Sequence, residues 1–385
     1  MSLDLLELER RFIGFDTVSR NSNLAMVSHL EELLRALGCR VDRFASQDGT
    51  KANVFATLGP VDVGGLMLAG HMDVVPVEGQ AWNTDPFALT ESEGRLFGRG
   101  TADMKSFIAL ALVAAEAVRL RKLRRPLHLA FTYDEEVGCH GASRLMEGLK
   151  RSNHVLPACA VIGEPTGYQV FRLHKGFHSV RVKVKGVEGH SSKPGKGANA
   201  IAQMGRVLEK VMAVSQERST KRSMAEFFEV PHTTVNVGLI QGGTALNIIP
   251  NHCEMFFEYR TMPGEDSEFV YRQVEGYVRE VLLPEFRKQQ PQVDMTVELT
   301  GRGLPMMTPP GTEIEALALE LTGNAKSSAA PYYTEGAIYN ESGIPTVICG
   351  PGDIDQAHRP NEFVTREQLE QGQPFLGRLI ERVCL

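Results

Sequence analysis

The stretch "LMLAGHMDVVP", Leu66 to Pro76, places a histidine and an aspartate directly after a short apolar run. Such a run is typical of a buried strand, and residues two apart on a strand point to the same side. His71 and Asp73 therefore share one side at the carboxyl end of the strand, where ligand sites of open α/β sheets gather. A histidine with a carboxylate suits a metal ligand whose tautomer is fixed by a partner. An ordinary hydrogen-bonded pair is the alternative for this motif alone.

Strand and helix patterns alternate on both sides of this stretch. Residues 105–120 and 142–150 have the apolar spacing of helices, while 127–133 and 158–163 are short apolar runs. The same alternation returns after residue 303, with helical patterns at 311–323 and 366–383 around a strand at 345–350. Short apolar strands between helices predict an α/β domain with a mainly parallel central sheet.

The middle of the chain has a different pattern. Residues 179–302 give the order strand, helix, strand, strand, helix, strand. This β-α-β-β-α-β order is that of ferredoxin-like units. We therefore expect an inserted α+β domain at 179–302, between two parts of one catalytic domain at 1–178 and 303–385.

Composition excludes several classes of protein. The 385 residues carry a net charge of −6, whereas a nucleic-acid partner normally needs a concentrated basic face. No apolar run reaches membrane-spanning length, and acidic residues interrupt the amino-terminal pattern where a signal peptide would be apolar. The six cysteines are scattered without a C-x-x-C pair, which favours reduced thiols and a cytoplasmic location.

Acidic residues or histidine stand at the end of strand after strand. Asp103 precedes a long apolar helix, the acidic triplet 134–136 and Glu164 follow apolar runs, and His358 lies in a loop after another. Each has an ordinary alternative: Asp103 could cap its helix, and the triplet could be a solvated turn. Adjacent carboxylates repel unless they face outward or meet a cation. Together, two histidines and several carboxylates without cysteine predict one or two divalent ions, zinc first.

Six motifs carry a family resemblance. In chain order they are "GHMDVVP", "GRGTADMK", "DEEVG", "GEPT", "GHSSKP" and "AHRPNE". In this order they resemble the co-catalytic zinc amidohydrolases that include acetylornithine deacetylases, succinyl-diaminopimelate desuccinylases, aminoacylases and carboxypeptidases. The resemblance covers nearly the whole chain and implies a metallopeptidase-like catalytic domain with an inserted dimerisation or lid domain. "HKG" at 174–176 and "YYTEGAIY" at 332–339 most resemble the acetylornithine deacetylases.

The resemblance implies roles for the residues of the metal centre. Glu135 is the expected general base, and the peptide bond after Asp103 is expected to be cis. Zinc is the expected metal, as one or two ions per subunit, and cobalt could substitute. The implied ligands and their partner are His71 with Asp73 behind it, Asp103 as the bridge, Glu164 on the ion held by His71, and Glu136 with His358 on the other ion.

The resemblance also implies residues that contact the substrate. His190 would reach the substrate carbonyl, often across a dimer interface formed by the inserted domain. Asn247 and Arg260 would hold the substrate carboxylate, where a guanidinium fork fits. Glu335 would read a second ammonium of an acetylornithine-type substrate, and a surface carboxylate is its alternative. The implied reaction is metal-dependent hydrolysis of a small N-acyl amino acid, N2-acetyl-L-ornithine first, to acetate and the free amino acid of arginine biosynthesis.

Several rival functions remain. The same machinery could desuccinylate diaminopimelate or act as a broad aminoacylase or dipeptidase. A metal-free binding relative is an alternative of another class, although such relatives usually lose the base or a ligand, and none is missing here. A serine nucleophile is disfavoured because there is no G-x-S-x-G motif, and "GRGTAD" lacks the third glycine of a dinucleotide fingerprint.

Overall fold

The computed structural model describes residues 3–385, which divide into two compact units. The first unit holds the described residues up to Leu173 together with Met307–Ala329 and Thr334–Leu385. The second unit holds His174–Met306 and Ala330–Tyr333. Among residues 3–385, no helix is at once long enough and apolar enough to span a membrane.

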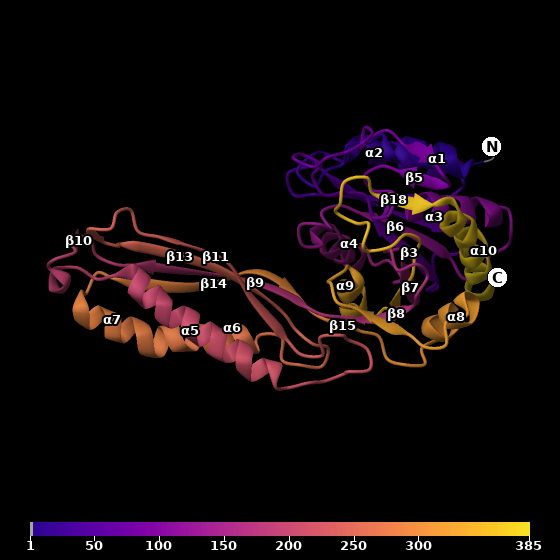
Figure 1. Ribbon diagram of the computed structural model, residues 1–385. Helices are drawn as coiled ribbons and strands as arrows, with labels where there is room; N and C mark the ends of the chain where they lie inside the picture. The colour runs from indigo at the N-terminus through magenta and orange to yellow at the C-terminus, as the bar shows by residue number, and fades with distance from the viewer. Residues whose placement is uncertain (1–2) are drawn as a thin grey trace. The chain divides into compact units, whose positions relative to one another are not determined.

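The first unit is built on a mixed sheet whose central strands run parallel (Figure 1). Its strands are β1 (Arg40–Ala45), β2 (Ala52–Leu58), β3 (Leu66–His71), β6 (Leu127–Thr132), β7 (Cys159–Ile162), β8 (Phe171–His174), β15 (Met306–Met307), β16 (Ser328–Ala330) and β17 (Thr346–Ile348). The order is β1-β2-β6-β3-β7-β17-β8-β15, with β16 beside β8. β3 pairs in parallel with both β6 and β7, and β17 pairs in parallel with β7. The predicted mainly parallel centre is confirmed.

Helices cover this sheet, and α3 is the most buried of them. The helices are α1 (Leu5–Ile13), α2 (Leu24–Ala36), α3 (Lys105–Val118), α4 (His140–Arg151), α8 (Glu313–Thr322), α9 (Gly336–Glu341) and α10 (Arg366–Cys384). α3 contacts α1, α10 and β3, which explains why its sequence is apolar on almost every side. A small separate sheet, β18-β5-β4, joins β4 (Thr90–Ser92), β5 (Arg95–Phe97) and β18 (Phe363–Thr365).

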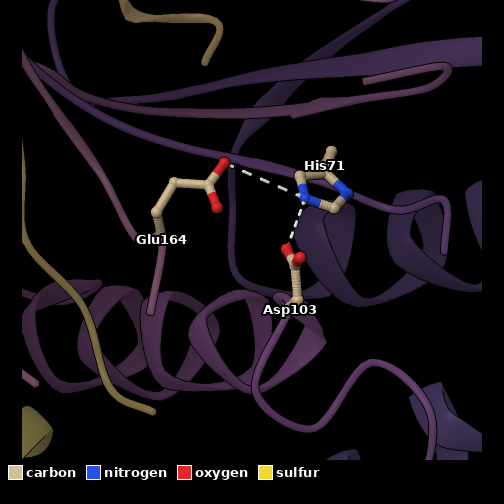
Figure 2. Close-up of side chains that lie close together, drawn as sticks. All are labelled: His71, Asp103 and Glu164. Atoms are coloured by element: carbon tan, nitrogen blue, oxygen red, sulfur yellow. Dashed lines mark hydrogen bonds and ion pairs between the residues drawn. The ribbon is translucent and has the colours of Figure 1, made fainter. Parts of the chain in front are cut away.

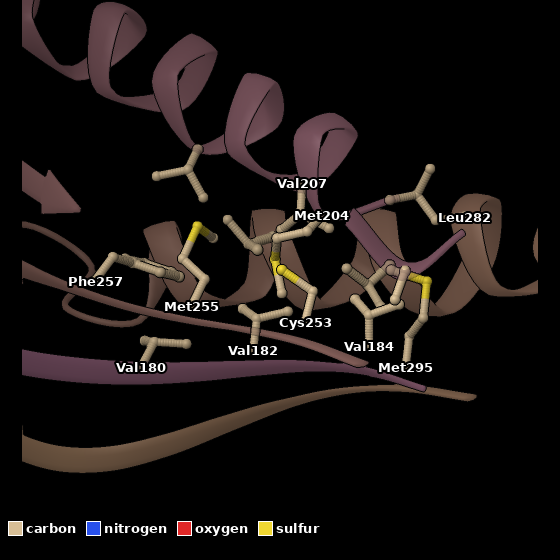
Figure 3. Close-up of a cluster of buried hydrophobic side chains, with 14 of the residues drawn as sticks. Val180, Val182, Val184, Met204, Val207, Cys253, Met255, Phe257, Leu282 and Met295 are labelled. Atoms are coloured by element: carbon tan, nitrogen blue, oxygen red, sulfur yellow. The ribbon is translucent and has the colours of Figure 1, made fainter. Parts of the chain in front are cut away.

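The second unit confirms the β-α-β-β-α-β order. Its elements are β9 (Phe177–Lys185), β10 (Gly189–His190), a 3-10 turn (Pro194–Lys196), α5 (Ala200–Ser219), β11 (Thr234–Gly242), β12 (Ile248–Ile249), β13 (His252–Arg260), α6 (Phe269–Tyr277), α7 (Leu283–Gln289) and β14 (Asp294–Gly303). Four strands form an antiparallel sheet in the order β11-β13-β9-β14. Alternate residues of β9, such as Val180 and Val182, face Met204 and Val207 of α5 (Figure 3). This apolar layer is the core of the unit.

One predicted helix is interrupted. The sequence predicts a single helix over 267–283, whereas the structure has α6, a π-helical segment at Val278–Leu282, and then α7. Pro284 lies in the first turn of α7. Proline has no N–H for the regular ladder, so the preceding turn widens, and Pro284 itself sits where a helix tolerates it.

Candidate metal centre

The first unit brings the five predicted metal ligands and the predicted base to one edge of the sheet. Because β3, β6, β7 and β17 run in parallel, their carboxyl ends meet at this edge. His71 ends β3, the acidic turn follows β6, Glu164 follows β7, and His358 lies in the loop after β17. Asp103 lies two residues before α3, and its peptide bond to Met104 is cis, as expected.

Asp103 faces a histidine with each of its oxygens. His71 Nε2 lies 2.9 Å from Asp103 Oδ1 and 3.9 Å from Glu164 Oε1 (Figure 2). On the other side, His358 Nε2 lies 3.4 Å from Asp103 Oδ2 and 3.0 Å from Glu136 Oε2. In each group of three residues, the possible ligand atoms lie within 4.8 Å of one another. Asp103 therefore belongs to two donor sets at once.

These donor sets fit divalent metal ions. Nitrogen and oxygen donors about 2.0–2.2 Å from a tetrahedral zinc would lie about 3.4 Å from one another, close to the distances seen here. Burial raises the pKa of the Glu164 carboxyl well above its usual value, and the negative charge of Asp103 adds to the effect. Burial and Asp103 likewise raise the pKa of Glu136. Acidic groups crowded in this way are relieved by a cation.

The tautomer of His71 is fixed by a main-chain group. His71 Nδ1 lies 2.9 Å from the carbonyl oxygen of Asp73 and 3.7 Å from its carboxylate. A carbonyl can only accept, so Nδ1 carries the proton and Nε2 keeps its lone pair for an ion. The expectation that the Asp73 carboxylate would be this partner is therefore corrected: its peptide carbonyl is.

The Asp73 carboxylate instead anchors the acidic turn. It accepts from the backbone N–H groups of Glu135 and Glu136 at 3.1 and 3.3 Å. It also accepts from the Ser19 hydroxyl at 2.7 Å. The sequence analysis missed Ser19, because a lone serine in the segment "TVSRNS" gives no signal of its tertiary contact. Asp73 thereby holds the expected base, Glu135, and the expected ligand, Glu136, in one orientation.

Among the described residues, Glu135 belongs to neither donor set, but it is close enough to interact electrostatically with members of both. Burial raises the pKa of its carboxyl well above the usual value; His71 opposes this, and the charges of Glu164, Glu136 and Asp103 support it. The Cys139 thiol lies 3.4 Å from Glu135 Oε1. A carboxyl group that lies next to a metal site without being a ligand is placed to accept and return a proton.

The remaining predicted site residues divide between the two units. His190 and Asn247 are exposed neighbours at one end of the second unit, where β10 pairs with β12 and the Ser191 N–H donates to the Asn247 carbonyl. Arg260 ends β13, near Glu258 (3.3 Å) and over the Phe177 ring. β13 begins at His252, beside β12, so its nine residues separate His190 from Arg260 by roughly 25 Å at ~3.3 Å per residue.

Glu335 is buried in the first unit, only 1% exposed, so the surface alternative is wrong. Its Oε1 accepts from the Thr132 hydroxyl and its Oε2 from the Tyr339 hydroxyl at 3.0 Å. Burial raises the pKa of this carboxyl. Because both oxygens are engaged, the geometry favours holding the end of β6 against α9 over the expected contact with a substrate ammonium.

Known proteins resemble the chain over its full length. The family model described as "Peptidase family M20/M25/M40" matches residues 67–382. An acetylornithine deacetylase of Myxococcus xanthus is 36% identical, over 97% of this chain and 95% of its own length. An acetylornithine deacetylase of Proteus mirabilis is 34% identical, over 99% of this chain and 97% of its own.

A solved structure shares the fold. An M20 family metallo-carboxypeptidase from Sulfolobus solfataricus superposes with a TM-score of 0.77 at 16% identity, covering 98% of both chains. At this identity the likeness concerns the fold alone. The family model matches most of this chain, and two relatives are more than 30% identical to it. The chain therefore belongs to peptidase family M20/M25/M40.

Proposed function

We propose that this protein hydrolyses the amide bond of N2-acetyl-L-ornithine to L-ornithine and acetate, with a pair of zinc ions. The observation that carries the proposal is the placement of Asp103 between two donor sets, with Glu135 beside them. The substrate comes from the two relatives, both named acetylornithine deacetylase, that match nearly the whole chain. Cobalt, which accepts similar ligands and geometry, could replace zinc.

Six residues perform the work at the metal centre in this proposal. His71, Asp103 and Glu164 hold one ion, and Asp103, Glu136 and His358 hold the other. Such ions, when bound, lower the pKa of water and polarise a carbonyl. Glu135 accepts a proton from the attacking water and returns it to the leaving amine.

Residues of the second unit complete the proposed site. The His190 ring donates a hydrogen bond to the oxyanion that forms on the acyl carbon. The Arg260 guanidinium pairs with the α-carboxylate, and Asn247, a neighbour of His190, contacts the same carboxylate from the chain that supplies His190. An amino-acid substrate is only a few ångströms long, whereas His190 and Arg260 lie roughly 25 Å apart within one unit. Both can contact one substrate only if one of them comes from another subunit.

A homodimer through the second unit follows as part of the proposal. Within residues 3–385, β11 pairs with β13 on one side and is the last strand of its sheet. Leu239 and Ile240 on this strand are 55% and 49% exposed. An exposed apolar edge strand is a template for pairing with a second chain. Sedimentation should give a dimer for the native protein and a monomer for Leu239→Lys.

The proposal includes a cytoplasmic location. All six cysteines are free, and five of them are buried. Reduced thiols suit a reducing compartment. Fractionation of cells that produce the protein, with detection by antibody, would check this part.

A substrate panel tests the proposed function. Metal-free protein is reloaded with zinc or cobalt and assayed on N2-acetylornithine, N-acetylmethionine, N-succinyl-diaminopimelate and a dipeptide. We expect the highest kcat/KM on N2-acetylornithine and no turnover after chelation. Preference for another member of the panel would reassign the substrate within the family. Failure to release an amine from every compound, with two ions bound, would contradict the proposal.

A further inference from the structure

A buried carboxylate outside the donor sets holds the main chain of the bridging aspartate. Glu362 is 1% exposed, and its Oε1 accepts from the backbone N–H groups of Gly100 (3.0 Å), Ala102 (2.9 Å) and Asp103 (3.1 Å). Three donors on one oxygen fix the turn that delivers Asp103 to the edge of the sheet. Glu362 closes the motif "AHRPNE", in which only His358 has been given a role so far.

The second oxygen of Glu362 leads to the other metal-ligand loop. Glu362 Oε2 accepts from Arg99 at 2.5 Å, and Arg99 is also only 1% exposed. Arg99 donates to Gln80 Oε1 at 2.7 Å, and Gln80 Nε2 donates to the carbonyl of His358 at 2.8 Å. One chain of hydrogen bonds therefore runs from the amide of Asp103 to the carbonyl of His358.

The backbone conformation of His358 is unusual, so the hydrogen bonds that support it matter. His358 has φ of 64°, in the left-handed region that residues other than glycine seldom adopt. Its carbonyl is held by Gln80, and the next carbonyl, that of Arg359, lies 3.4 Å from Arg99. A backbone in this region persists where its surroundings determine it. Gln80 and Arg99 supply that support on the loop that carries His358.

We propose that Glu362 and Arg99 are positioning residues that hold the Asp103 and His358 loops at the separation needed for two metal ions. Neither belongs to the donor sets; they act through the backbone of the residues that do. Loss of groups that orient metal ligands typically lowers metal affinity 10–100-fold. The inference rests on the metal centre of the proposed function and adds which residues pre-organise it.

Three variants separate the two ends of the network. Glu362→Ala removes both ends, so both zinc ions should bind 10–100-fold more weakly. Glu362→Gln keeps one oxygen for the three N–H groups but turns its amide N–H₂ toward Arg99, so only the Arg99 end is lost. Gln80→Ala cuts the same end at His358, and Gln80 is only half-buried, so this variant should fold. Glu362→Gln and Gln80→Ala should both weaken binding of the ion held with His358 and leave binding of the ion held by His71 unchanged.

A buried ion pair elsewhere in the first unit supplies the matched control. Glu315 is 5% exposed and holds Arg172 (3.2 Å), the Ser327 hydroxyl (2.6 Å) and the backbone N–H of Gly311 (2.6 Å). Glu315→Gln should lower the unfolding temperature without changing either zinc affinity. A purely structural role for Glu362 would make its variants behave in the same way.

Zinc affinities measured by competition with a fluorescent chelator on full-length, metal-free protein test the inference. Trp82, the one tryptophan of the chain, gives a second readout, since its ring lies under Arg99 and its Nε1 lies 3.1 Å from Gln80 Oε1. Glu362→Gln should shift its emission to longer wavelength, and Glu315→Gln should not. Wild-type zinc affinities in folded Glu362→Gln and Gln80→Ala would overturn the inference. Absence of zinc binding by the native protein would overturn the metal centre itself, and this inference with it.

Discussion

The two units differ in what they bury. The first unit buries Asp103, Glu164 and His71 at one edge of its sheet, together with the Arg99–Glu362 pair. The core of the second unit is apolar, a layer of valines and methionines between its sheet and its helices (Figure 3). Its predicted site residues His190 and Asn247 are exposed instead. Burying charge is costly unless partners or ions compensate it. The buried charges of the proposed metal centre therefore destabilise the first unit, whereas the second unit presents its polar site residues on the surface of an apolar core.

The proposed base, Glu135, gives the largest expected effect. Glu135→Ala should lower kcat by ~10²–10⁴-fold, the usual contribution of a general base, and keep its metal, because Glu135 belongs to neither donor set. Steady-state kinetics and metal analysis check this. Asp134→Asn is the matched control, since Asp134 pairs with Lys51 and should retain activity. Full activity of Glu135→Ala, or loss of its metal, would reverse the roles of Glu135 and Glu136.

Complementation between subunits gives the next test, because it asks whether the second unit of one chain serves the first unit of another. If His190 serves the site of a second subunit, inactive His190→Ala mixed with inactive Glu135→Ala should regain activity. In a random mixture of the two, one site in each mixed dimer would have both groups intact. Mass spectrometry of the mixture must show that subunits exchange. Mixed dimers without activity would assign His190 to its own chain.

The apolar core of the second unit should affect stability rather than metal binding. Met255 is fully buried in that core, and Met255→Ala should cost about 2–5 kcal/mol of stability by leaving a cavity. Calorimetry measures the loss, and chelator competition should find both zinc affinities unchanged. A drop in zinc affinity would mean that the units are not independent in this respect.

Glu335 gives the smallest expected effect and probes the buried polar groups of the first unit. Glu335→Gln replaces two hydrogen bonds to a carboxylate by weaker bonds to a neutral amide, in which one hydroxyl must turn to accept from the N–H₂ group, so it should cost about 1–3 kcal/mol of stability. Its kcat/KM should fall by similar factors on N2-acetylornithine and on N-acetylmethionine, which has no second ammonium. A loss confined to N2-acetylornithine would restore the role of Glu335 in reading that ammonium.

Local pattern was sufficient where strands are apolar throughout. β3, β6 and β7 are short buried runs, so both their identity and the polar residues at their ends could be predicted. β1 and β2 were missed. β2 is fully buried, but Asn53 and Thr57 interrupt its apolar run. Both are satisfied by distant groups, the Gly141 carbonyl and His128, which the local sequence does not reveal.

The same limit applies to the site. The order of strand ends was enough to assemble His71, Glu164 and His358, because parallel strands end at one edge, whereas Asp103 precedes α3 and its place as the bridge was implied by the resemblance. The partner of His71 could not be foreseen, since a main-chain carbonyl replaces the expected carboxylate. Nor could the burial of Glu335, which depends on Thr132, 203 residues away in the sequence. Contacts between distant segments decide these details.

The most direct test of the account is the number of zinc ions held by one chain. Native mass spectrometry of zinc-loaded protein should give two ions per subunit. Asp103→Ala, which removes the oxygens shared by both donor sets, should give none at the same free zinc concentration while circular dichroism remains native. Two ions retained by folded Asp103→Ala, or none bound by the native chain, would contradict the claim that Asp103 bridges a two-metal centre.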